Sequence, residues 1–362
     1  MKQKAILSHK KILTLDKDHK QAAKAASLTY TSDSKPGITR QKKSKGYTYL
    51  AAGKTLKNKA ELERIKKLAI PPSWTSVWIC PGANGHIQAT GLDLNGRKQY
   101  RYHAEWSKLR TETKFHRLYE FGKALPLLRK KIKKDLEQAE LTETKVLATI
   151  VNLMEHTHIR VGNNGYEKLY GSYGLTTLKD RHVTIKKEDI RFCFTGKKGI
   201  EHSISLKNKR LSRIIRQCRD IPGKELFQYY TSDGQKRSVD SGMVNNYIQE
   251  ITQAEFTAKD FRTWAGSLQA LENFHSLDEP LNASDIRNNI ITVLDAVSNK
   301  LGNSRSICKK YYVHPGLIQL YEEDKLKNYF PSSPSKHKIA GLSAEEKILL
   351  QTLKNWRENR PY

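Results

Sequence analysis

The sequence predicts an α+β protein in which a small β-rich N-terminal domain precedes a larger, mainly α domain with one β-hairpin. Three observations lead to this fold class. Short alternating runs between turn signals fill residues 47–107, apolar residues then recur at helical spacing, and one later stretch alternates on both sides of a glycine-lysine turn. The predicted domains are therefore residues 1–46, 47–107 and 108–362.

The first segment, residues 1–46, is rich in Lys, Ser, Thr and Gln and contains few aromatic residues. It ends in a basic run that includes Arg40, Lys42, Lys43 and Lys45. Such a composition predicts a basic, flexible arm. An electrostatic contact with nucleic acid and a solvated tail would both account for it.

Residues 47–107 carry short β-like signals, first VWICP after the break at Pro71 and Pro72 and then HIQATGLDLNGRKQYRYHAEW. In the second stretch two runs flank Asn95 and Gly96, a pair typical of the type I′ turn of a hairpin. The segment NKAELERIKKLA predicts a helix. Together these signals indicate a small domain of β-strands with one or two helices.

Beyond residue 107 the apolar pattern is helical. The periodic positions are Val146, Leu147, Ile150, Val151 and Met154 in one stretch and Ile286, Ile290, Leu294, Val297 and Leu301 in another. The exception is RFCFTGKKGIEHSISL, residues 191–206, which predicts a hairpin with two lysines at its tip. The stretch SSPSKHK, residues 332–338, predicts a linker to a final short helix.

The composition indicates a polyanionic partner, with nucleic acid as the first candidate. Lys and Arg number 65 against 37 Asp and Glu, which gives a formal net charge of +28. No apolar run approaches the roughly 18 residues of a membrane span, so we expect a cytoplasmic protein without a membrane partner. The four cysteines are far apart and form no CxxC pair, which predicts neither a disulfide framework nor a zinc site.

Three residues are candidates for chemistry. Arg160 follows an amphipathic helix, and Arg262 lies at the edge of an apolar stripe in a helix that Thr257 could cap. Taken alone, each arginine is also explained as a structural ion-pair partner. Tyr312 comes shortly after two basic residues, Lys309 and Lys310, but spacing alone does not distinguish it from the other tyrosines.

Recognisable motifs change this balance. In order along the chain, GRKQYRY, IRVGNNGYEKLYGSYGLTTLK, FTGKKGIEH, KDFRTWAG and GNSRSICKKYYVHP closely resemble signatures of type IB DNA topoisomerases of the poxviral and bacterial branch. The resemblance covers roughly residues 47–320. It implies relaxation of supercoiled DNA by a tyrosine that cleaves one strand, forms a 3′-phosphotyrosyl link, permits rotation and reseals the strand. It further implies a monomer associated with the nucleoid, whose two domains clamp duplex DNA without ATP, metal or another cofactor.

The resemblance also implies roles for individual residues. Tyr312 matches the nucleophile, Arg160 and Arg262 the two catalytic arginines, and Lys197 the catalytic lysine, with Lys198 as its neighbouring alternative. Guanidinium groups can bind phosphate oxygens bidentately, and a lysine beside other cations can protonate a leaving oxygen.

Asn303 stands where the poxviral members have a histidine. In having asparagine at this position the chain resembles the bacterial members of the family. An amide cannot transfer protons as an imidazole does, so only hydrogen bonding to the phosphate is expected of it. The sequence also shows no GxxxxGK[ST] loop for ATP. His156 and His158, two residues apart on a helix, point in different directions and do not suggest a metal pair.

DNA contacts outside the catalytic set are expected on the strand that contains Arg97. Alternation places Gln99 and Arg101 on one side and Tyr100 and Tyr102 on the other. The resemblance favours DNA contacts at Arg97, Gln99, Tyr100, Tyr102 and Tyr166. The alternative for this strand is a solvated edge strand without a role in binding. Lys259 matches the KDFR motif and could assist at the DNA, but it is equally explained as an exposed lysine on a helix.

Two other functions fit part of the pattern. A tyrosine recombinase uses the same clamp and nucleophile, but Ala258–Phe261 supply no histidine three residues before Arg262. Recombinases also typically carry a helical N-terminal domain, whereas this one is predicted to be β. A non-catalytic basic DNA-binding protein would explain the charge, yet it leaves the ordered set of Arg, Lys, Arg, Asn and Tyr unexplained.

Overall fold

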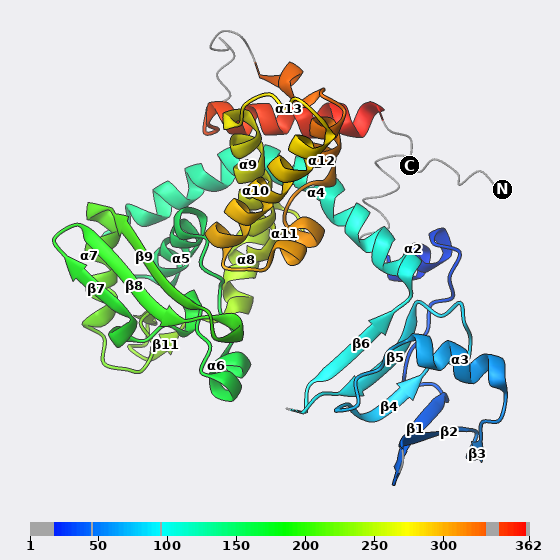
Figure 1. Cartoon of the computed structure of the whole chain (residues 1–362). Helices are drawn as coiled ribbons and strands as arrows, with labels where there is room; N and C mark the ends of the chain where they lie inside the picture. Colours follow the sequence, from blue (N-terminus) through cyan, green and yellow to red (C-terminus); the bar gives the residue numbers. More distant parts are fainter. Residues whose placement is uncertain (1–17, 45, 95, 331–339, 360–362) are drawn as a thin grey trace. The chain divides into compact units, whose positions relative to one another are not determined.

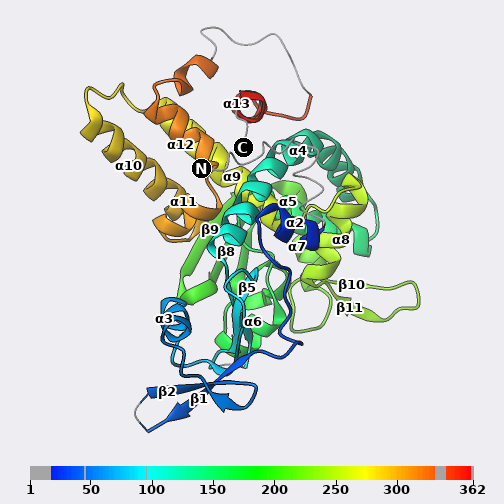
Figure 2. The same ribbon diagram turned by 90° about the vertical axis from the view of Figure 1, so that its right-hand side faces the viewer.

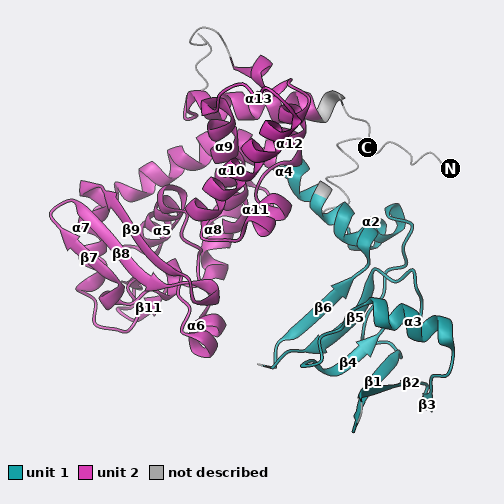
Figure 3. Ribbon diagram, in the orientation of Figure 1, with its two compact units in different colours: residues 1–117, 361–362 teal, residues 118–360 magenta. Residues whose placement is uncertain are grey.

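The computed structural model describes residues 18–44, 46–94, 96–330 and 340–359. It divides into two compact units, residues 1–117 with 361–362 and residues 118–360 (Figure 3). The division falls within the long helix α4 (Ala104–Leu136), ten residues after the boundary expected at residue 107. Helix and sheet are mixed and the N-terminal region is β-rich, as the sequence predicts (Figure 1).

The first unit is built on a six-stranded antiparallel sheet with strand order β3-β2-β1-β4-β5-β6. Its elements are α2 (His19–Ala25), β1 (Ile38–Lys43), β2 (Gly46–Ala51), β3 (Lys54–Thr55), α3 (Lys59–Lys67), β4 (Thr75–Ile79), β5 (Ile87–Leu92) and β6 (Lys98–Tyr102). Ile65 of α3 packs on Ile38, Val77, Ile79 and Ala89 of the strands, so the helix covers one face of the sheet. The predicted helix at NKAELERIKKLA is therefore confirmed as α3.

Part of the segment expected to be a flexible arm is ordered. Ala22 and Ala23 of α2 are buried with Trp106 and Leu109, and β1 pairs with both β2 and β4. Arg40 donates hydrogen bonds to three main-chain carbonyls, those of Ile70, Pro71 and Trp74. The prediction missed this order because the basic composition of the segment outweighs its few apolar residues, which pack into the core of the unit. Residues 1–17 and Lys45 lie outside the described residues.

The predicted hairpin around Asn95 is present as the antiparallel pair of β5 and β6. Gly96 has a positive φ of +70°, in keeping with a turn that needs left-handed backbone. Asn95 itself lies outside the described residues. β6 ends the strand order, so its outer edge has no partner strand among the residues described.

The second unit is mainly helical. Its helices, after α4, are α5 (Glu143–Thr157), α6 (Asn164–Tyr170), α7 (Lys209–Arg219), α8 (Ser241–Thr252), α9 (Ala258–Ser276), α10 (Ala283–Leu301), α11 (Arg305–Tyr311), α12 (Pro315–Glu322) and α13 (Ala344–Asn359), and its 3-10 turns are η1 (Leu175–Thr177), η2 (Asp180–His182), η3 (Lys197–Gly199) and η4 (Leu326–Tyr329). Its strands are β7 (Val183–Lys186), β8 (Asp189–Thr195), β9 (Glu201–Lys207), β10 (Gln228–Tyr230) and β11 (Lys236–Ser238). The helices α9 and α10 lie side by side (Figure 2).

The helical periodicity and the hairpin of the sequence prediction are confirmed. The first apolar set lies on α5 and the second on α10, and residues 191–206 form the β8–β9 hairpin with η3 at its tip. β7 extends the hairpin to three strands, and β10 and β11 form a separate pair that was not predicted. The expected linker at 332–338 lies outside the described residues, and α13 follows it.

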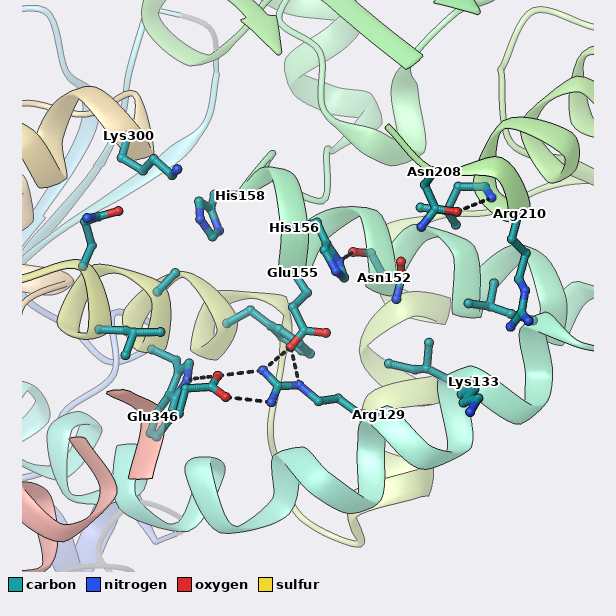
Figure 4. A pocket seen from close by; sticks show the side chains of 18 of the residues that line it. Arg129, Lys133, Asn152, Glu155, His156, His158, Asn208, Arg210, Lys300 and Glu346 are labelled. Carbon is teal, nitrogen blue, oxygen red and sulfur yellow. Dashed lines mark hydrogen bonds and ion pairs between the residues drawn. The ribbon is translucent and has the colours of Figure 1, made fainter. Parts of the chain in front are cut away.

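One ion network joins three helices of this unit (Figure 4). Arg129 of α4 donates to both carboxylate oxygens of Glu346 on α13, at 2.6 and 2.8 Å, and to Glu155 of α5 at 2.7 Å. Glu346 also accepts a hydrogen bond of 3.1 Å from the indole nitrogen of Trp264 on α9. The network lines a cavity of about 730 Å³. Residue 346 thus ties α13 to the helix that carries Arg262.

The structure predicts that Arg129→Met destabilises the fold, because Glu346 is only 5% exposed and would lose its countercharge. We expect the free energy of unfolding in urea to fall by roughly 3 kcal/mol at pH 7. Lys123→Met, which removes an exposed pair with Glu120, is the control and should change it by less than about 1 kcal/mol. Equal stabilities of the two variants would contradict the role of the network.

The same network predicts a pH dependence. Burial raises the pKa of Glu346, but the hydrogen bonds and charge of Arg129 outweigh it, so the pKa lies below its ordinary value of 4.5. A carboxyl with a lowered pKa stabilises the fold above the unfolded-state pKa and loses this contribution as the pH falls. The gap between wild type and Arg129→Met should therefore narrow as urea titrations move below pH 4.5.

Candidate active site

A cavity of about 710 Å³ in the second unit gathers the residues expected to be catalytic. The expected residues that line it are Arg160, Tyr166, Lys197, Lys259, Arg262, Asn303 and Tyr312. They come from four separate stretches of chain, so the fold rather than local sequence brings them together. Lys198, Tyr173 and Tyr311 also line the cavity. Of these, only Lys198 was expected from the sequence, as the alternative to Lys197.

Arg160 lies three residues beyond the end of α5. The helix stops because His158 adopts left-handed backbone, with φ 56° and ψ 15°, and its amide bonds the carbonyl of Met154. The next residues are fixed by main-chain hydrogen bonds, from Leu175 to the carbonyl of Arg160 at 2.9 Å and from Thr176 to that of Val161 at 2.7 Å. This pairing explains why the arginine and the later GLTT segment form one motif.

Arg262 lies in the first turns of α9, which Thr257 and Asp260 cap reciprocally. The predicted cap is thus confirmed, but Arg262 is 5% exposed and is buried rather than at the margin of the apolar stripe. Its guanidinium donates to the carbonyl of Leu301 at 2.6 Å and to that of His158. Its Nε has no hydrogen-bond partner among the described residues.

Asn303 follows the end of α10, where Gly302 is left-handed with φ 57°. Arg160 donates to the carbonyl of Gly302 at 3.0 Å and to Oδ1 of Asn303 at 2.7 Å. This contact turns the amide nitrogen of Asn303 away from Arg160, and that buried nitrogen has no partner among the described residues. Two unsatisfied donors, Arg262 Nε and Asn303 Nδ2, therefore belong to residues that line one cavity.

Within the described part of the chain no carboxylate neutralises the charge of the two arginines, because the groups that accept hydrogen bonds from them are carbonyl and amide oxygens and, for Arg262, the phenol of Tyr312. The ion-pair explanation for them is therefore wrong for these residues. Burial, followed by the charge of Arg262, lowers the pKa of Arg160 to about 10, which keeps it protonated at neutral pH. Burial also lowers the pKa of Arg262, against the opposing effect of Tyr312.

Tyr312 caps the C-terminal end of α11, and its ring centre lies 5.3 Å from the guanidinium carbon of Arg262. Helix α9 also holds its main chain, because Ser267 donates to the carbonyl of Tyr312 at 3.1 Å. A Cβ on Gly266 would stand 2.8 Å from that carbonyl oxygen, so the glycine of KDFRTWAG permits this approach. Helix α9 thus positions both the guanidinium of Arg262 and the main chain of Tyr312.

Lys197 lies in η3, between β8 and β9, as the hairpin prediction requires. Its ammonium nitrogen lies 5.2 Å from the centre of the Tyr166 ring, within the range of a cation–π contact. Tyr166 comes from α6, so this contact joins the hairpin tip to the segment that follows Arg160.

The expected DNA contacts of the first unit lie on and beside β6. Arg97 and Gln99 both bond the carboxylate of Asp93, at 2.8 and 2.9 Å. Tyr100 and Tyr102 stack with ring centres 5.6 Å apart and are 42% and 46% exposed. The predicted alternation of this strand is confirmed for the tyrosines, while the engagement of Asp93 was not foreseen.

Two further properties concern possible ligands and location. Across the described residues no group of three or more His, Cys, Asp or Glu side chains could hold a metal ion. Likewise, no helix in the described ranges is both long enough and apolar enough to cross a membrane.

Comparison with known proteins matches both parts of the chain. Residues 46–93 match the family model of the bacterial DNA topoisomerase IB N-terminal domain, and residues 103–331 that of the eukaryotic DNA topoisomerase I catalytic core. DNA topoisomerase 1B of Acanthamoeba polyphaga mimivirus is 34% identical over 271 residues, which cover 73% of this chain and 81% of the relative. DNA topoisomerase 1B of Vaccinia virus (strain Copenhagen) is 23% identical over 238 residues, covering 64% and 72%.

These matches confirm the family resemblance of the motifs and favour it over the recombinase and the non-catalytic binding protein. Both family models match in the order expected from the sequence, and a relative at 34% identity is covered over most of its length. The chain therefore belongs to the type IB DNA topoisomerases and is an isomerase that acts on DNA.

Proposed function

We propose that the protein relaxes supercoiled DNA through a transient break in one strand, with Tyr312 as the nucleophile. The observation that carries this mechanism is the pair of unsatisfied donors, Arg262 Nε and Asn303 Nδ2, at the cavity that Tyr312 also lines. Buried donors without partners are costly, and a phosphate in the cavity would satisfy both.

In the proposed step the phenolic oxygen of Tyr312 attacks phosphorus and the bond from phosphorus to the 5′-oxygen breaks. A free tyrosine has a pKa of about 10, so attack at neutral pH needs help from neighbouring cations, and the guanidinium carbon of Arg262 lies 5.3 Å from the centre of the Tyr312 ring. Negative charge grows on the nonbridging oxygens, where Arg160, Arg262 and the amide of Asn303 would stabilise it. Attack by the freed 5′-hydroxyl reverses the step and reseals the strand.

The departing 5′-oxygen needs a proton, which we assign to Lys197. The hairpin tip brings its ammonium group to the cavity, and Tyr166 supports it from α6. Because the ester to Tyr312 conserves the energy of the broken bond, the proposed cycle needs no ATP. Charge neutralisation by the two arginines likewise leaves no step that calls for a metal or another cofactor.

For the DNA duplex, we propose a clamp formed by the two units, with Arg97, Gln99, Tyr100 and Tyr102 as contacts of the first. The two tyrosines offer exposed aromatic faces, and Gln99 keeps an amide oxygen that can accept from a base edge. Tyr166 and Lys259, at the cavity, are proposed contacts of the second unit. We further propose that the protein works as a monomer on the cytoplasmic nucleoid.

Removal of the nucleophile tests the function directly. Tyr312→Phe should lower the rate of plasmid relaxation in EDTA, without ATP, by at least roughly 10³-fold while DNA binding persists. Tyr311→Phe is the matched control, since Tyr311 lines the same cavity, and it should stay within a few fold of wild type. Relaxation that persists in Tyr312→Phe would overturn the assignment.

The proton donor can be tested with a better leaving group. Lys197→Ala should slow single-turnover cleavage by about 10² to 10⁴-fold on ordinary DNA. A 5′-bridging sulfur leaves without protonation, so the same variant should cleave such DNA at nearly the wild-type rate. Lys198→Ala serves as the control, and rescue of that variant instead of Lys197→Ala would move the role to Lys198.

The backbone of His158 offers a third test, because its carbonyl holds Arg262 and its φ is +56°. Glycine and asparagine tolerate this conformation, whereas a β-branched residue costs about 1 to 2 kcal/mol. His158→Gly and His158→Asn should therefore cleave DNA faster and unfold at higher urea than His158→Val. The reverse order would show that the imidazole, rather than the turn, matters.

A further inference from the structure

His202 closes the FTGKKGIEH motif and has no role in the mechanism above. It lies on β9 directly opposite Phe194 of β8, and the two rings stack with centres 5.0 Å apart and planes inclined by 21°. The side chain is half-buried on the inward face of the hairpin. Its position is therefore fixed by the sheet.

The ring lies against the start of the turn that holds Lys197. A Cβ built on Gly196 would stand 2.6 Å from two atoms of the imidazole, Cδ2 and Nε2. The turn itself is closed by hydrogen bonds from Gly196 to the carbonyl of Ile200 at 2.7 Å and from Gly199 to that of Gly196 at 3.2 Å. Movement of the imidazole ring would therefore shift Gly196, at the start of this turn.

The same ring also meets the segment that holds the phosphate-binding groups. A Cβ on Gly302 would stand 2.6 Å from Cε1 of His202. The carbonyl of Gly302 accepts from Arg160, and the next residue is Asn303. One imidazole thus touches the residue before the proposed proton donor and the residue before a proposed phosphate contact.

The electrostatic setting keeps this ring uncharged at neutral pH. Burial is the largest cause that lowers the pKa of His202 below its ordinary 6.5, followed by the charges of Arg160 and Arg262. A neutral ring packs between two glycines as a flat spacer and adds no further cation to the cavity.

We propose that His202 is a positioning residue that sets the Lys197 turn at a fixed distance from the Arg160–Asn303 pair. The proton donor then stands at the leaving oxygen while the phosphate is held. This inference rests on the proposed role of Lys197. Small displacements of a reacting group can cost about 10²-fold in rate, which sets the scale of the effect.

The test compares His202→Ala with His202→Phe in single-turnover cleavage of ordinary DNA and of DNA with a 5′-bridging sulfur. His202→Ala removes the spacer and should slow ordinary cleavage by about 10 to 100-fold, with near wild-type rates on the sulfur substrate. His202→Phe keeps a flat ring and should retain most of the rate on both substrates. Ser203→Ala, an exposed neighbour on the same strand, is the control.

A second variant approaches the contact from the turn and guards against loss of folding in His202→Ala. Gly196 has φ of −92°, which alanine tolerates, but the added methyl would push against the ring. Gly196→Ala should therefore show the same slow cleavage of ordinary DNA and the same rescue by sulfur.

Lys197→Ala, measured in parallel, separates the two hypotheses. If sulfur fails to rescue Lys197→Ala, the proposed proton donor is wrong and the inference about His202 falls with it. If sulfur rescues Lys197→Ala while both His202→Ala and Gly196→Ala stay equally slow on the two substrates, the inference alone is overturned. Wild-type rates in these two folded variants would overturn it as well.

Discussion

Two helices end at the candidate active site, and their last carbonyl groups hold its arginines. His158 closes α5, and Leu301 and Gly302 close α10; their oxygens accept from Arg262 and Arg160. The final carbonyls of a helix have no partner within it and carry a partial negative charge, so they suit a guanidinium. Because these acceptors are not ionised, both arginines remain net cations. A carboxylate in their place would have neutralised the positive charge on which the proposed phosphate contact depends.

Helix α9 packs against both of the helices that end here, α5 and α10. α9 carries Arg262, permits the approach of Tyr312 at Gly266 and bonds the carbonyl of that tyrosine through Ser267. A shift of α9 would therefore move the guanidinium and the phenol together rather than separate them. The left-handed residues His158 and Gly302 end the other two helices where their carbonyls reach the arginines.

The sequence was sufficient for the long periodic helices, the hairpin around Lys197 and the cap of α9, because these depend on local spacing and turn chemistry. The site residues were found through motif resemblance, since Arg160, Lys197 and Tyr312 are distant in the chain and only the fold unites them. Among the features that escaped prediction, three have a clear physical reason. Main-chain carbonyls accept hydrogen bonds whatever the residue type, so the partners of the arginines cannot be read from the sequence. Asp93 reaches Arg97 and Gln99 across a turn. The few apolar residues of α2 and β1 are outnumbered by charged ones, which hides the core they form. The roles of the individual site residues stay predictions.

The network around Glu346 has a consequence for the order in which the protein is made. Arg129, Glu155 and Trp264 all precede Tyr312 in the chain, whereas Glu346 follows it. During synthesis Tyr312 is therefore added to the chain before the carboxylate that ties α13 to α9. The contact between Glu346 of α13 and Trp264 of α9, the helix that carries Arg262, can therefore form only late in synthesis, after Tyr312 has been added.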